Sequence, residues 1–405
     1  MVNVGIDTLA IYSSHYALAL PTLALAKGYE ANKYEMSLGQ CTMSVPPPGE
    51  DIVTMALNAA QQALQGIALQ TIEMLLFATE SGIDQSKAAG LYVHHLLGLS
   101  PRCRVVELKQ ACYSATAALQ LALPFLRENP EKKVLVIASD IARYGLDTSG
   151  ESSQGAGAVA LVLSANPRLL AFEPEYGVVA EDVMDFWRPN YRDEALVDGK
   201  YSSRLYLTML EKCWKQYQSL SGRGIHDHAY YCYHVPVPKL VEKAHAYLLK
   251  INGQEKMTEA AEQQFQASLH YGRKMGNSYT ASLYVALASL FDNVKEDLTH
   301  QRIGFYSYGS GCVAEYFSGI VQPQYQRALH SHYHADLFAH RTLLSYADYV
   351  NFYQFPYVKD GGEQTLPVYQ TGLFRLTKLQ QHKRVYEKIE PAWQQHHVEP
   401  VQAAL

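Results

Sequence analysis

RVVELKQACYSATAALQLALPFL, residues 104–126, is the stretch of sequence that decides the fold. Its first residues are mostly apolar and predict a short strand, and the run from residue 111 onward, rich in Ala and Leu, predicts a helix. Cys112 lies at the junction between the two. An α/β fold places many of its functional groups at such strand-to-helix junctions.

Cys112 is therefore a candidate nucleophile. A thiol at the start of a helix lies near free backbone N–H groups and near the positive end of the helix dipole, and both favour the thiolate. The same N–H groups could hold an oxyanion formed on an attacked thioester. A buried structural cysteine is the alternative, because cysteine is often buried.

The alternation of apolar runs and helical patterns extends over the first half of the chain. Strands are predicted at residues 2–12, 73–79, 133–139 and 157–164, and helices at residues 50–64 and 86–97. Together with residues 104–126 the order is β-α-β-α-β-α-β-β. This order predicts an α/β fold with a mostly parallel sheet covered by helices.

The second half looks like a looser copy of the first. Helices are predicted at residues 203–218, 238–250, 259–269 and 279–291, and strands at residues 229–235, 302–309 and 313–321. In each half a Gly-x-Gly turn, at Gly155–Gly157 and Gly309–Gly311, leads into the last strand. The echo predicts a duplication, with a first half at 1–165 and a second half at 166–405 that ends in surface helices and loops. Neither turn is a dinucleotide fingerprint, which would open a helix.

Composition excludes some classes of function. The net charge of −5 gives no general footprint for nucleic acid, and we find no apolar run long enough to span a bilayer and no signal peptide. We expect a cytoplasmic protein whose six cysteines stay reduced. His330, His332, His334 and His340 gather in one segment, but their spacing fits no metal motif. We expect a solvated surface there and no metal.

Four other residues are candidates for chemistry, each with a structural alternative. Glu80 ends a strand, where burial would raise its pKa and make it a general acid or base; it could equally be a solvated turn residue. His234 follows a strand and precedes two prolines, and it could transfer a proton or only be hydrogen-bonded. Asn277 could bind a ligand or cap a helix. Ser310 lies in a glycine turn whose N–H could contribute to an oxyanion hole.

Nine segments occur in one order and together resemble the 3-hydroxy-3-methylglutaryl-CoA (HMG-CoA) synthase family, particularly its bacterial mevalonate-pathway form. The resemblance covers about residues 2–355. The segments are ATESG (78–82), ELKQACYSAT (107–116), ASDIARYG (138–145), SQGAGAVALVL (153–163), MDFWRP (184–189), LVDGKYS (196–202), YHVPVPK (233–239), GNSYTASLY (276–284) and SYGSG (307–311).

The resemblance implies a thiolase fold, with two duplicated halves in a five-layer α-β-α-β-α core, and a homodimer. It implies an acyltransferase in isoprenoid biosynthesis that condenses acetyl-CoA with acetoacetyl-CoA, without a metal or redox cofactor. Cys112 would carry the acetyl group, Glu80 would deprotonate its methyl group, and His234 would polarise the acetoacetyl ketone. Asn277 would hold the acyl chain, and Ser310 with Cys112 would bind the oxyanions.

Further positions follow from the resemblance. Ser153, Ser202 and Glu30 fall where the family contacts substrate, although the family usually has Thr at the first of them and often Asp at the last. Lys239 and Lys243, one helical turn apart, would meet the anionic part of CoA. Supporting roles are expected for Asp140, Tyr144 and Asp198.

Three alternatives remain open. A polyketide β-branching synthase of the same family would take acyl groups from an acyl carrier protein, although GQCTMSVP (39–46), DFWRP (185–189) and LVDG (196–199) favour the mevalonate form. A β-ketoacyl synthase III or a thiolase would pair its cysteine with His-Asn or His-Cys and has no counterpart of Glu80. A catalytically silent acyl-thioester binder would not need the full Cys, Glu, His and Asn set.

Overall fold

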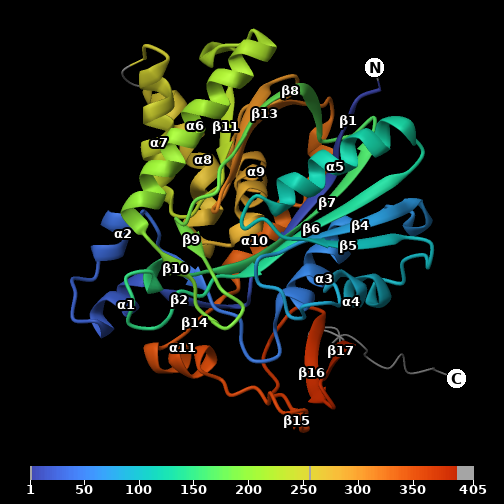
Figure 1. Ribbon diagram of the computed structural model, residues 1–405, viewed down its shortest axis with the longest axis vertical. Helices are drawn as coiled ribbons and strands as arrows, with labels where there is room; N and C mark the ends of the chain where they lie inside the picture. Colours follow the sequence, from blue (N-terminus) through green and yellow to red (C-terminus); the bar gives the residue numbers. More distant parts are fainter. Residues whose placement is uncertain (1, 255–256, 390–405) are drawn as a thin grey trace, which may run out of the picture.

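The computed structural model describes residues 2–254 and 257–389 of the 405. A nine-stranded sheet runs through the molecule in the order β11-β12-β13-β8-β1-β7-β6-β4-β5 (Figure 1). Its strands are β1 (Val4–Tyr12), β4 (Ile72–Ala78), β5 (Arg104–Leu108), β6 (Lys133–Ile141), β7 (Ala156–Ala165), β8 (Leu170–Ala180), β11 (Tyr230–Tyr233), β12 (Arg302–Gly309) and β13 (Val313–Val321).

The strand order repeats between the two halves. In the first half β1 pairs antiparallel with β7, β7 antiparallel with β6, and β6 parallel with β4. In the second half β8, β13, β12 and β11 follow the same sequence of pairings. The predicted duplication is thus visible in the topology. The boundary predicted at 165/166 falls in the turn between β7 and β8 and stays a prediction.

The two halves of the sheet meet at β1 and β8, which pair through Gly5 with Ala171 and Ile6 with Leu170. Gly5 is required at this seam, because a Cβ there would lie 2.0 Å from the carbonyl oxygen of Leu170. The seam thus depends on close backbone approach rather than on side-chain packing.

Helices cover the sheet in layers. On the first half, α3 (Ile52–Ala63) packs with Leu135 and Ile137 of β6, whereas α5 (Ser114–Glu128) packs with Val134 and Val136 on the opposite face. Alternate side chains of a strand point to opposite faces, so β6 is buried on both sides. α9 (Ser282–Asn293) contacts β11, β12 and β1, and α6 (Gly199–Ser221) covers β8 and β13. Helices therefore cover the sheet on both faces.

The remaining elements complete the chain. They are α4 (Gly90–Leu96), α7 (Pro238–Ile251), α8 (Glu259–Met275), α1 (Leu20–Ala26), α2 (Lys33–Leu38), α10 (Ser331–Ala339), α11 (Tyr346–Tyr353), the short strands β2 (Tyr16–Ala19), β3 (Thr42–Ser44), β9 (Phe186–Trp187), β10 (Leu196–Val197) and β14 (Thr342–Leu343), and the tail strands β15 (Gln364–Thr365), β16 (Phe374–Gln380) and β17 (Lys383–Lys388). None of the helices in the described part of the chain is long and apolar enough to cross a membrane.

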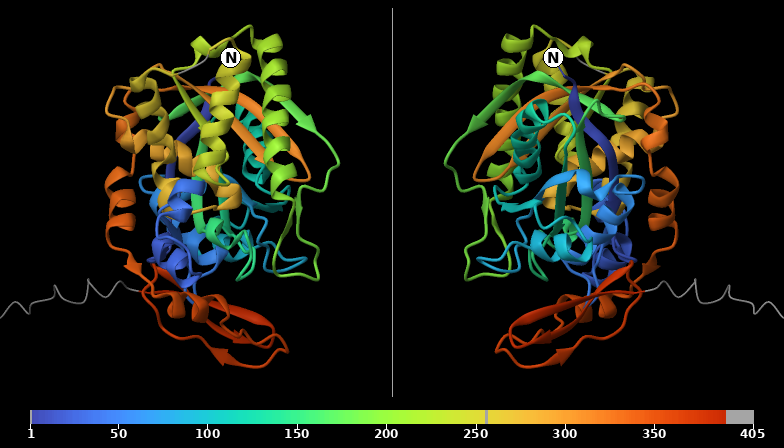
Figure 2. Two further views of the ribbon diagram at one scale, coloured as in Figure 1. Left: turned by 90° about the vertical axis from the view of Figure 1, so that its left-hand side faces the viewer. Right: turned by 90° about the vertical axis from the view of Figure 1, so that its right-hand side faces the viewer.

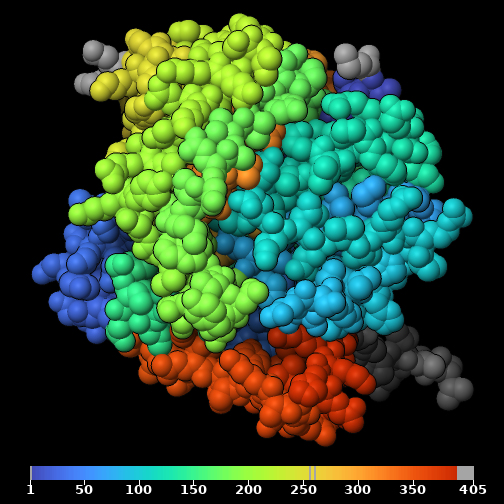
Figure 3. Space-filling model, in the orientation of Figure 1, coloured from blue at the N-terminus to red at the C-terminus, as the bar shows by residue number. Residues whose placement is uncertain are grey.

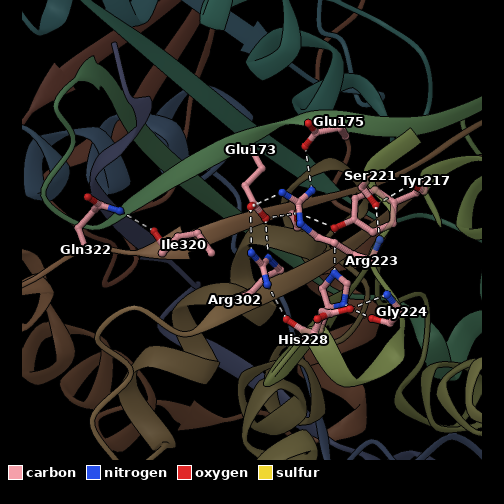
Figure 4. A network of polar contacts seen from close by, with 12 residues as sticks. Glu173, Glu175, Tyr217, Ser221, Arg223, Gly224, His228, Arg302, Ile320 and Gln322 are labelled. Atoms are coloured by element: carbon pink, nitrogen blue, oxygen red, sulfur yellow. Dashed lines mark hydrogen bonds and ion pairs between the residues drawn. The ribbon is translucent and has the colours of Figure 1, made fainter. Parts of the chain in front are cut away.

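Strand β8 was not predicted from the sequence. Its segment LAFEPEYGVVA carries Glu173, Pro174 and Glu175, which obscure the apolar pattern of a central strand. Figure 4 shows how the charges are neutralised: Arg302 of β12 and Arg223, beyond α6, both bind Glu173, and Arg223 also binds Glu175 at 2.8 Å. Ion pairing with Arg302, two strands away in the sheet, and with Arg223 beyond α6 therefore allows two carboxylates in this strand.

The predictions for the tail were wrong in two respects. The tail contains the antiparallel sheet β15–β16–β17, drawn in red beneath the rest of the chain in Figures 1 and 2, where only helices and loops were expected. The histidine-rich segment is also not simply a solvated surface. His334 is 2% exposed, accepts the N–H of Ile11 through Nε2 and contacts Asp292 through Nδ1 at 2.7 Å. His330 contacts Thr8 and Gln62, so both histidines hold α10 against the core.

Candidate active site

The candidate residues gather at the carboxyl ends of the strands. Glu80 lies two residues beyond β4, Cys112 four beyond β5, His234 directly beyond β11 and Ser310 directly beyond β12. β4 and β5 run parallel and end at one edge, and β11 and β12 run parallel and end at another; such edges are the usual ligand-binding edges of α/β sheets. The hydrogen bond from Gln110 Nε2 to the carbonyl oxygen of Ser310, at 3.2 Å, brings the two edges together. In the space-filling view, the surface is hollowed between the light-green segment that carries β9 and β10 and the cyan surface to its right (Figure 3).

Cys112 and Glu80 are in direct contact, since the thiol donates to Oε1 of Glu80 at 2.8 Å. Both residues are partly exposed, so they lie at an opening and not in the sealed core. Cys112 precedes helix α5, which begins only at Ser114, and the preceding Ala111 has a φ of 43°. The helix therefore starts three residues later than expected and leaves the thiol in a tight turn.

The thiolate expected for Cys112 is not what the structure favours. Burial and the carboxylates of Glu80, Asp140 and Asp185 raise the pKa of Cys112 well above its ordinary value. The helix dipole acts only within the first turn of α5, whereas these three carboxylates come from other parts of the chain and outweigh it. Cys112 thus rests as a thiol hydrogen-bonded to a carboxylate, and it needs a base before it can attack.

Glu80 is suited to be that base. Burial, with a smaller contribution from Asp140, raises the pKa of Glu80 to about 8, whereas the Cys112 hydrogen bond and the Arg188 guanidinium oppose the rise. Arg188, just beyond β9, also donates to the backbone oxygen of Glu80. The expected desolvation of Glu80 is therefore present, together with a cation that the sequence reasoning missed.

Asp140, at 0% exposure, holds the Glu80 segment in place. Its carboxylate accepts hydrogen bonds from Thr79 Oγ1 and from the N–H groups of Glu80, Ser81 and Thr280. Three of these donors belong to the turn after β4 and one belongs to the turn before α9. Asp140 thus joins the two halves directly beneath Glu80.

His234 is 3% exposed, and burial lowers its pKa to about 3, so the ring is neutral at physiological pH. Its Nδ1 lies 2.6 Å from Oγ of Ser282, which also accepts the N–H of Val235 at 3.1 Å. Because the Ser282 hydroxyl oxygen already accepts the hydrogen bond from Val235, its own hydrogen is available to donate to Nδ1. Nδ1 then acts as the acceptor, and the ring proton of His234 lies on Nε2. The ring of Tyr206 lies beside the imidazole, with its hydroxyl bonded to the backbone oxygen of His234.

Asn277 is paired with Tyr144, to which its side-chain amide donates at 3.1 Å. The Tyr144 ring packs against Tyr279 and Phe186 in edge-to-face geometry. Burial, together with nearby Cys112 and Glu80, raises the pKa of the Tyr144 phenol. Asn277 and Tyr144 therefore come together near the thiol, as the sequence predicts for a site residue and its support.

The turn that carries Ser310 is held from two sides. The carbonyl oxygen of Ser310 accepts from Gln110 Nε2 at 3.2 Å, and the N–H of Gly311 donates to Asp185 at 2.9 Å. Tyr308 and Ser202 also donate to the Asp185 carboxylate, at 2.6 and 2.9 Å. Ser202 therefore acts here through Asp185, a buried residue in MDFWRP that the sequence reasoning did not single out.

Two predicted residues have local structural roles. Asp198 caps α6, since its side chain accepts from the N–H of Tyr201, and its own N–H donates to the backbone of Asp185. Ser153 bonds to the carbonyl of Gly150, and its own carbonyl accepts from the N–H of Asn277. Asp198 and Ser153 therefore support segments that lead to the site.

Three other predicted residues lie on the outer surface. Glu30 is exposed between α1 and α2, and Lys239 and Lys243 are exposed on α7, which contacts α2. Lys239 is paired with Glu242 at 2.8 Å. The structure thus places them away from the Cys112–Glu80 pair, on a rim of α1, α2 and α7. Within residues 2–254 and 257–389, no three His, Cys, Asp or Glu side chains gather as metal ligands would.

Comparison with known proteins matches both halves of the chain. The family model "Hydroxymethylglutaryl-coenzyme A synthase N terminal" matches residues 1–167, and its C-terminal counterpart matches residues 171–260 and 252–351. The hydroxymethylglutaryl-CoA synthase of Enterococcus faecalis is 40% identical over 86% of this chain and 91% of its own length. The polyketide biosynthesis 3-hydroxy-3-methylglutaryl-ACP synthase PksG of Bacillus subtilis is 36% identical, over 80% of this chain and 82% of its own length.

A crystal structure of HMG-CoA synthase complexed with CoA superposes with a TM-score of 0.91 at 38% identity, covering 96% of this chain and 100% of that one. The thiolase-like fold expected from the sequence is thereby confirmed. Sequence, topology and the convergence of the candidate residues lead to one conclusion: the chain belongs to the HMG-CoA synthase family of thiolase-like acyltransferases.

Proposed function

We propose that this enzyme condenses acetyl-CoA with acetoacetyl-CoA to form HMG-CoA through an acetyl-Cys112 intermediate. The observation that carries the proposal is the 2.8 Å contact between the Cys112 thiol and Glu80, beside a neutral His234. The pair supplies a nucleophile and its base in one site. The chemistry needs no metal or redox cofactor, and coenzyme A thioesters are the substrates.

In the first step, Glu80 accepts the proton of the Cys112 thiol, and the thiolate attacks the carbonyl carbon of acetyl-CoA. The carbon–sulfur bond to CoA breaks, and the departing sulfur takes up the proton. The negative oxygen formed on the way would be held by the N–H groups of Cys112 and Ser310. A raised pKa near 8 suits Glu80 for taking and returning a proton.

In the second step, the Glu80 carboxylate removes a proton from the methyl group of acetyl-Cys112. The resulting carbanion forms a carbon–carbon bond to the ketone carbon of acetoacetyl-CoA, and the ketone oxygen takes up the proton that Glu80 removed from the methyl group. His234, with its proton on Nε2, polarises that oxygen by hydrogen bonding, and Asn277 holds the acyl chain. Water then cleaves the Cys112 thioester, which restores the thiol and leaves the free carboxylate of HMG-CoA.

Mass measurement after incubation with acetyl-CoA tests the proposal. Wild type should gain one acetyl group, and Cys112→Ala should gain none at that position. Glu80→Gln should form no HMG-CoA, even where acetyl-Cys112 is supplied by a slow uncatalysed reaction. The same measurement on Cys41→Ser removes a second exposed thiol as a source of adducts. A wild-type enzyme that gains no acetyl group would exclude the mechanism.

The second candidate function is transfer from an acyl carrier protein, as in the PksG relative. The higher identity to the Enterococcus faecalis protein favours coenzyme A. Comparing kcat/KM for acetyl-CoA with that for an acetylated carrier protein separates the two. A preference for the carrier would overturn our choice of donor.

We also propose a homodimer. Strand β5 ends the large sheet, and its edge is free of a further strand among the described residues. Val106 on β5 is 50% exposed and Leu91 on the neighbouring α4 is 43% exposed. An unpaired edge with apolar side chains favours pairing with a second copy. Val106→Lys should therefore produce monomers in size-exclusion chromatography, whereas Leu220→Lys, an exposed change at the end of α6 over the other half of the sheet, should not.

We place the enzyme in the cytoplasm and in the mevalonate route of isoprenoid biosynthesis. All six cysteines are free in the structure, as in a reducing compartment. The mevalonate assignment follows from the proposed product and from the resemblance of the nine segments to the bacterial mevalonate-pathway form of the family. Complementation of cells that lack an HMG-CoA synthase would test it, and failure of an active enzyme to restore growth would argue against it.

A further inference from the structure

Glu315 is a buried carboxylate that the proposed chemistry does not use. It lies on β13 in the second half of the chain and is 1% exposed. Its two oxygens accept hydrogen bonds from the hydroxyl of Tyr113, at 2.6 Å, and from the side-chain amide of Gln120, at 2.5 Å. Tyr113 follows Cys112 directly, and Gln120 lies on α5. A carboxylate of one half thus binds the segment that carries the nucleophile in the other half.

A second contact ties the same two segments from the other side of Cys112. Gln110 Nε2 donates to the carbonyl oxygen of Ser310 at 3.2 Å. Between the two contacts the backbones almost touch, since a Cβ on Gly309 would lie 2.6 Å from both the Gln110 oxygen and the Tyr113 nitrogen. The turn after β12 therefore packs directly on the Cys112 turn, with one side-chain hydrogen bond on each flank.

We propose that Gln110 and Glu315 are positioning residues that align the Cys112 turn with the Ser310 turn, so that the N–H groups of Cys112 and Ser310 act on one thioester oxygen. The inference rests on the proposed function, which assigns the oxyanion to those two groups. Because the two N–H groups belong to different halves, no covalent connection fixes their separation. Oxyanion donors are effective only within about 2.7–3.1 Å of the oxygen, so small shifts between the halves reduce catalysis.

If the two turns lose their alignment, one reaction of Cys112 should slow and another should not. Acetyl transfer to Cys112 passes through an oxyanion, whereas alkylation of the same thiol by iodoacetamide does not. Removal of Gln110 or Glu315 should therefore slow acetylation while leaving alkylation nearly unchanged. Loss of a single oxyanion donor costs about 10²–10³-fold in rate, so a displaced donor should cost about 10- to 100-fold.

The experiment uses the full-length enzyme in a Cys41→Ser background, which removes a competing exposed thiol. Gln110→Met and Glu315→Leu remove the two hydrogen-bonding groups, and Gln65→Met, an exposed substitution just beyond the end of α3, is the matched control. Glu315→Gln keeps one acceptor oxygen for Tyr113 and should lose less than Glu315→Leu. Single-turnover acetylation is followed by rapid quench and mass measurement, and alkylation is followed with iodoacetamide.

We expect Gln110→Met and Glu315→Leu to acetylate about 10- to 100-fold more slowly, with alkylation within about twofold of the background enzyme. Unchanged acetylation, or acetylation and alkylation that fall in parallel, would overturn the inference. If Glu315→Leu does not fold, Gln110→Met and Glu315→Gln decide by the same criteria. If the background enzyme itself is not acetylated, the proposed function fails first, and the alignment fails with it.

Discussion

At the residue scale, the Cys112 thiol and the Glu80 carboxyl group are in contact, and each of them resists ionisation. Burial raises the pKa of both, and neighbouring carboxylates add to the effect. Glu80 therefore becomes a carboxylate as the pH rises through about 8, and the carboxylate can then take the thiol proton and pass it to the departing thiolate. Arg188 is the cation that opposes this tendency from the β9–β10 hairpin.

The first prediction concerns Arg188. Because its guanidinium lowers the pKa of Glu80, Arg188→Gln should raise that pKa further. Proton removal from the acetyl methyl group needs the Glu80 carboxylate, so its rate should rise with pH through about 8 in wild type and at higher pH in the variant. Deuterium exchange into acetyl-enzyme at several pH values measures the midpoint. Arg192→Gln, an exposed change in the same loop, is the control, and an unshifted midpoint in Arg188→Gln would contradict the prediction.

The second prediction concerns Ser282, which sets the tautomer of His234. Ser282→Ala removes the donor to Nδ1, so the neutral ring can place its proton there instead of on Nε2. Condensation should slow by about 10- to 100-fold, since positioned proton donors contribute about 10²–10⁴-fold. Acetylation of Cys112 should be nearly unaffected, because it does not involve the ketone. Steady-state kcat and single-turnover acetylation separate the two, and an equal loss in both would argue for a structural role alone.

At the element scale, α3 shows how the tail is fastened to the core. Asp51 caps α3 by accepting the N–H groups of Val53 and Thr54, at 3.0 and 3.1 Å. The same carboxylate binds Arg384 and Tyr386 of β17, at 3.1 and 2.7 Å. One side chain thus serves both the start of a core helix and the docking of the tail sheet.

The third prediction follows from this double role. Asp51→Ala removes the cap, which costs about 0.5–2 kcal/mol, and also leaves Arg384 without its carboxylate. We expect the free energy of unfolding to fall by about 2 kcal/mol in urea denaturation. Asp51→Asn keeps an oxygen for the cap and should lose less. Equal losses in the two variants would show that the cap is not the main contribution.

A helix or strand could be predicted from the sequence where its own residues explain why it is buried. β6 has a continuous apolar run and α3 has apolar residues at helical spacing, so both were predicted, because nothing outside the segment is needed to explain them. β8 was missed, since its glutamates are tolerated only after Arg223 and Arg302 arrive from other segments. The tail strands were missed for a similar reason: charged residues such as Lys383 and Arg384 hide Phe374 and Leu376, which are buried against the core.

The same distinction applies to the site. Glu80, Cys112 and His234 could be found because each ends a recognisable strand. Asp185 and Ser282 could not, because their importance arises from contacts made by residues far away in the sequence, with Tyr308 and with His234. The prediction of a lowered pKa for Cys112 was wrong for the same reason. The helix terminus can be recognised in the sequence, whereas the carboxylates that approach the thiol from other segments cannot.

At the scale of the whole molecule, Asp7 joins the two halves beside their seam. Lying on β1, it binds Lys133 of β6 at 2.8 Å and Arg168, in the turn before β8, at 2.7 Å. Burial alone would raise the pKa of Asp7, but these two cations hold that pKa below its usual value. The ion pairs thus stabilise the place where the first half leads into the second.

The fourth prediction uses the sign of that shift. A carboxyl group whose pKa is lower in the folded state stabilises the fold at pH above its unfolded pKa of about 4, and this stabilisation is lost as the pH falls through the folded value. Asp7→Asn should therefore lower the free energy of unfolding at pH 7 by about 1–3 kcal/mol, reduced because Arg168 is half exposed. The difference from wild type should shrink below about pH 4. Urea unfolding at pH 7, 5 and 3.5 measures it, and a constant difference would refute the linkage.

The repeated strand order has a consequence for descent. A single ancestral unit with the order of β1, β7, β6 and β4 would have needed a second identical copy to cover its inner helix, and the gene fusion of two copies would leave the seam at β1 and β8. In such a symmetric ancestor every residue occurred twice. Once the copies were joined, one could keep the thiol and carboxylate while the other specialised in histidine and amide, so neither inherited half retains a complete site.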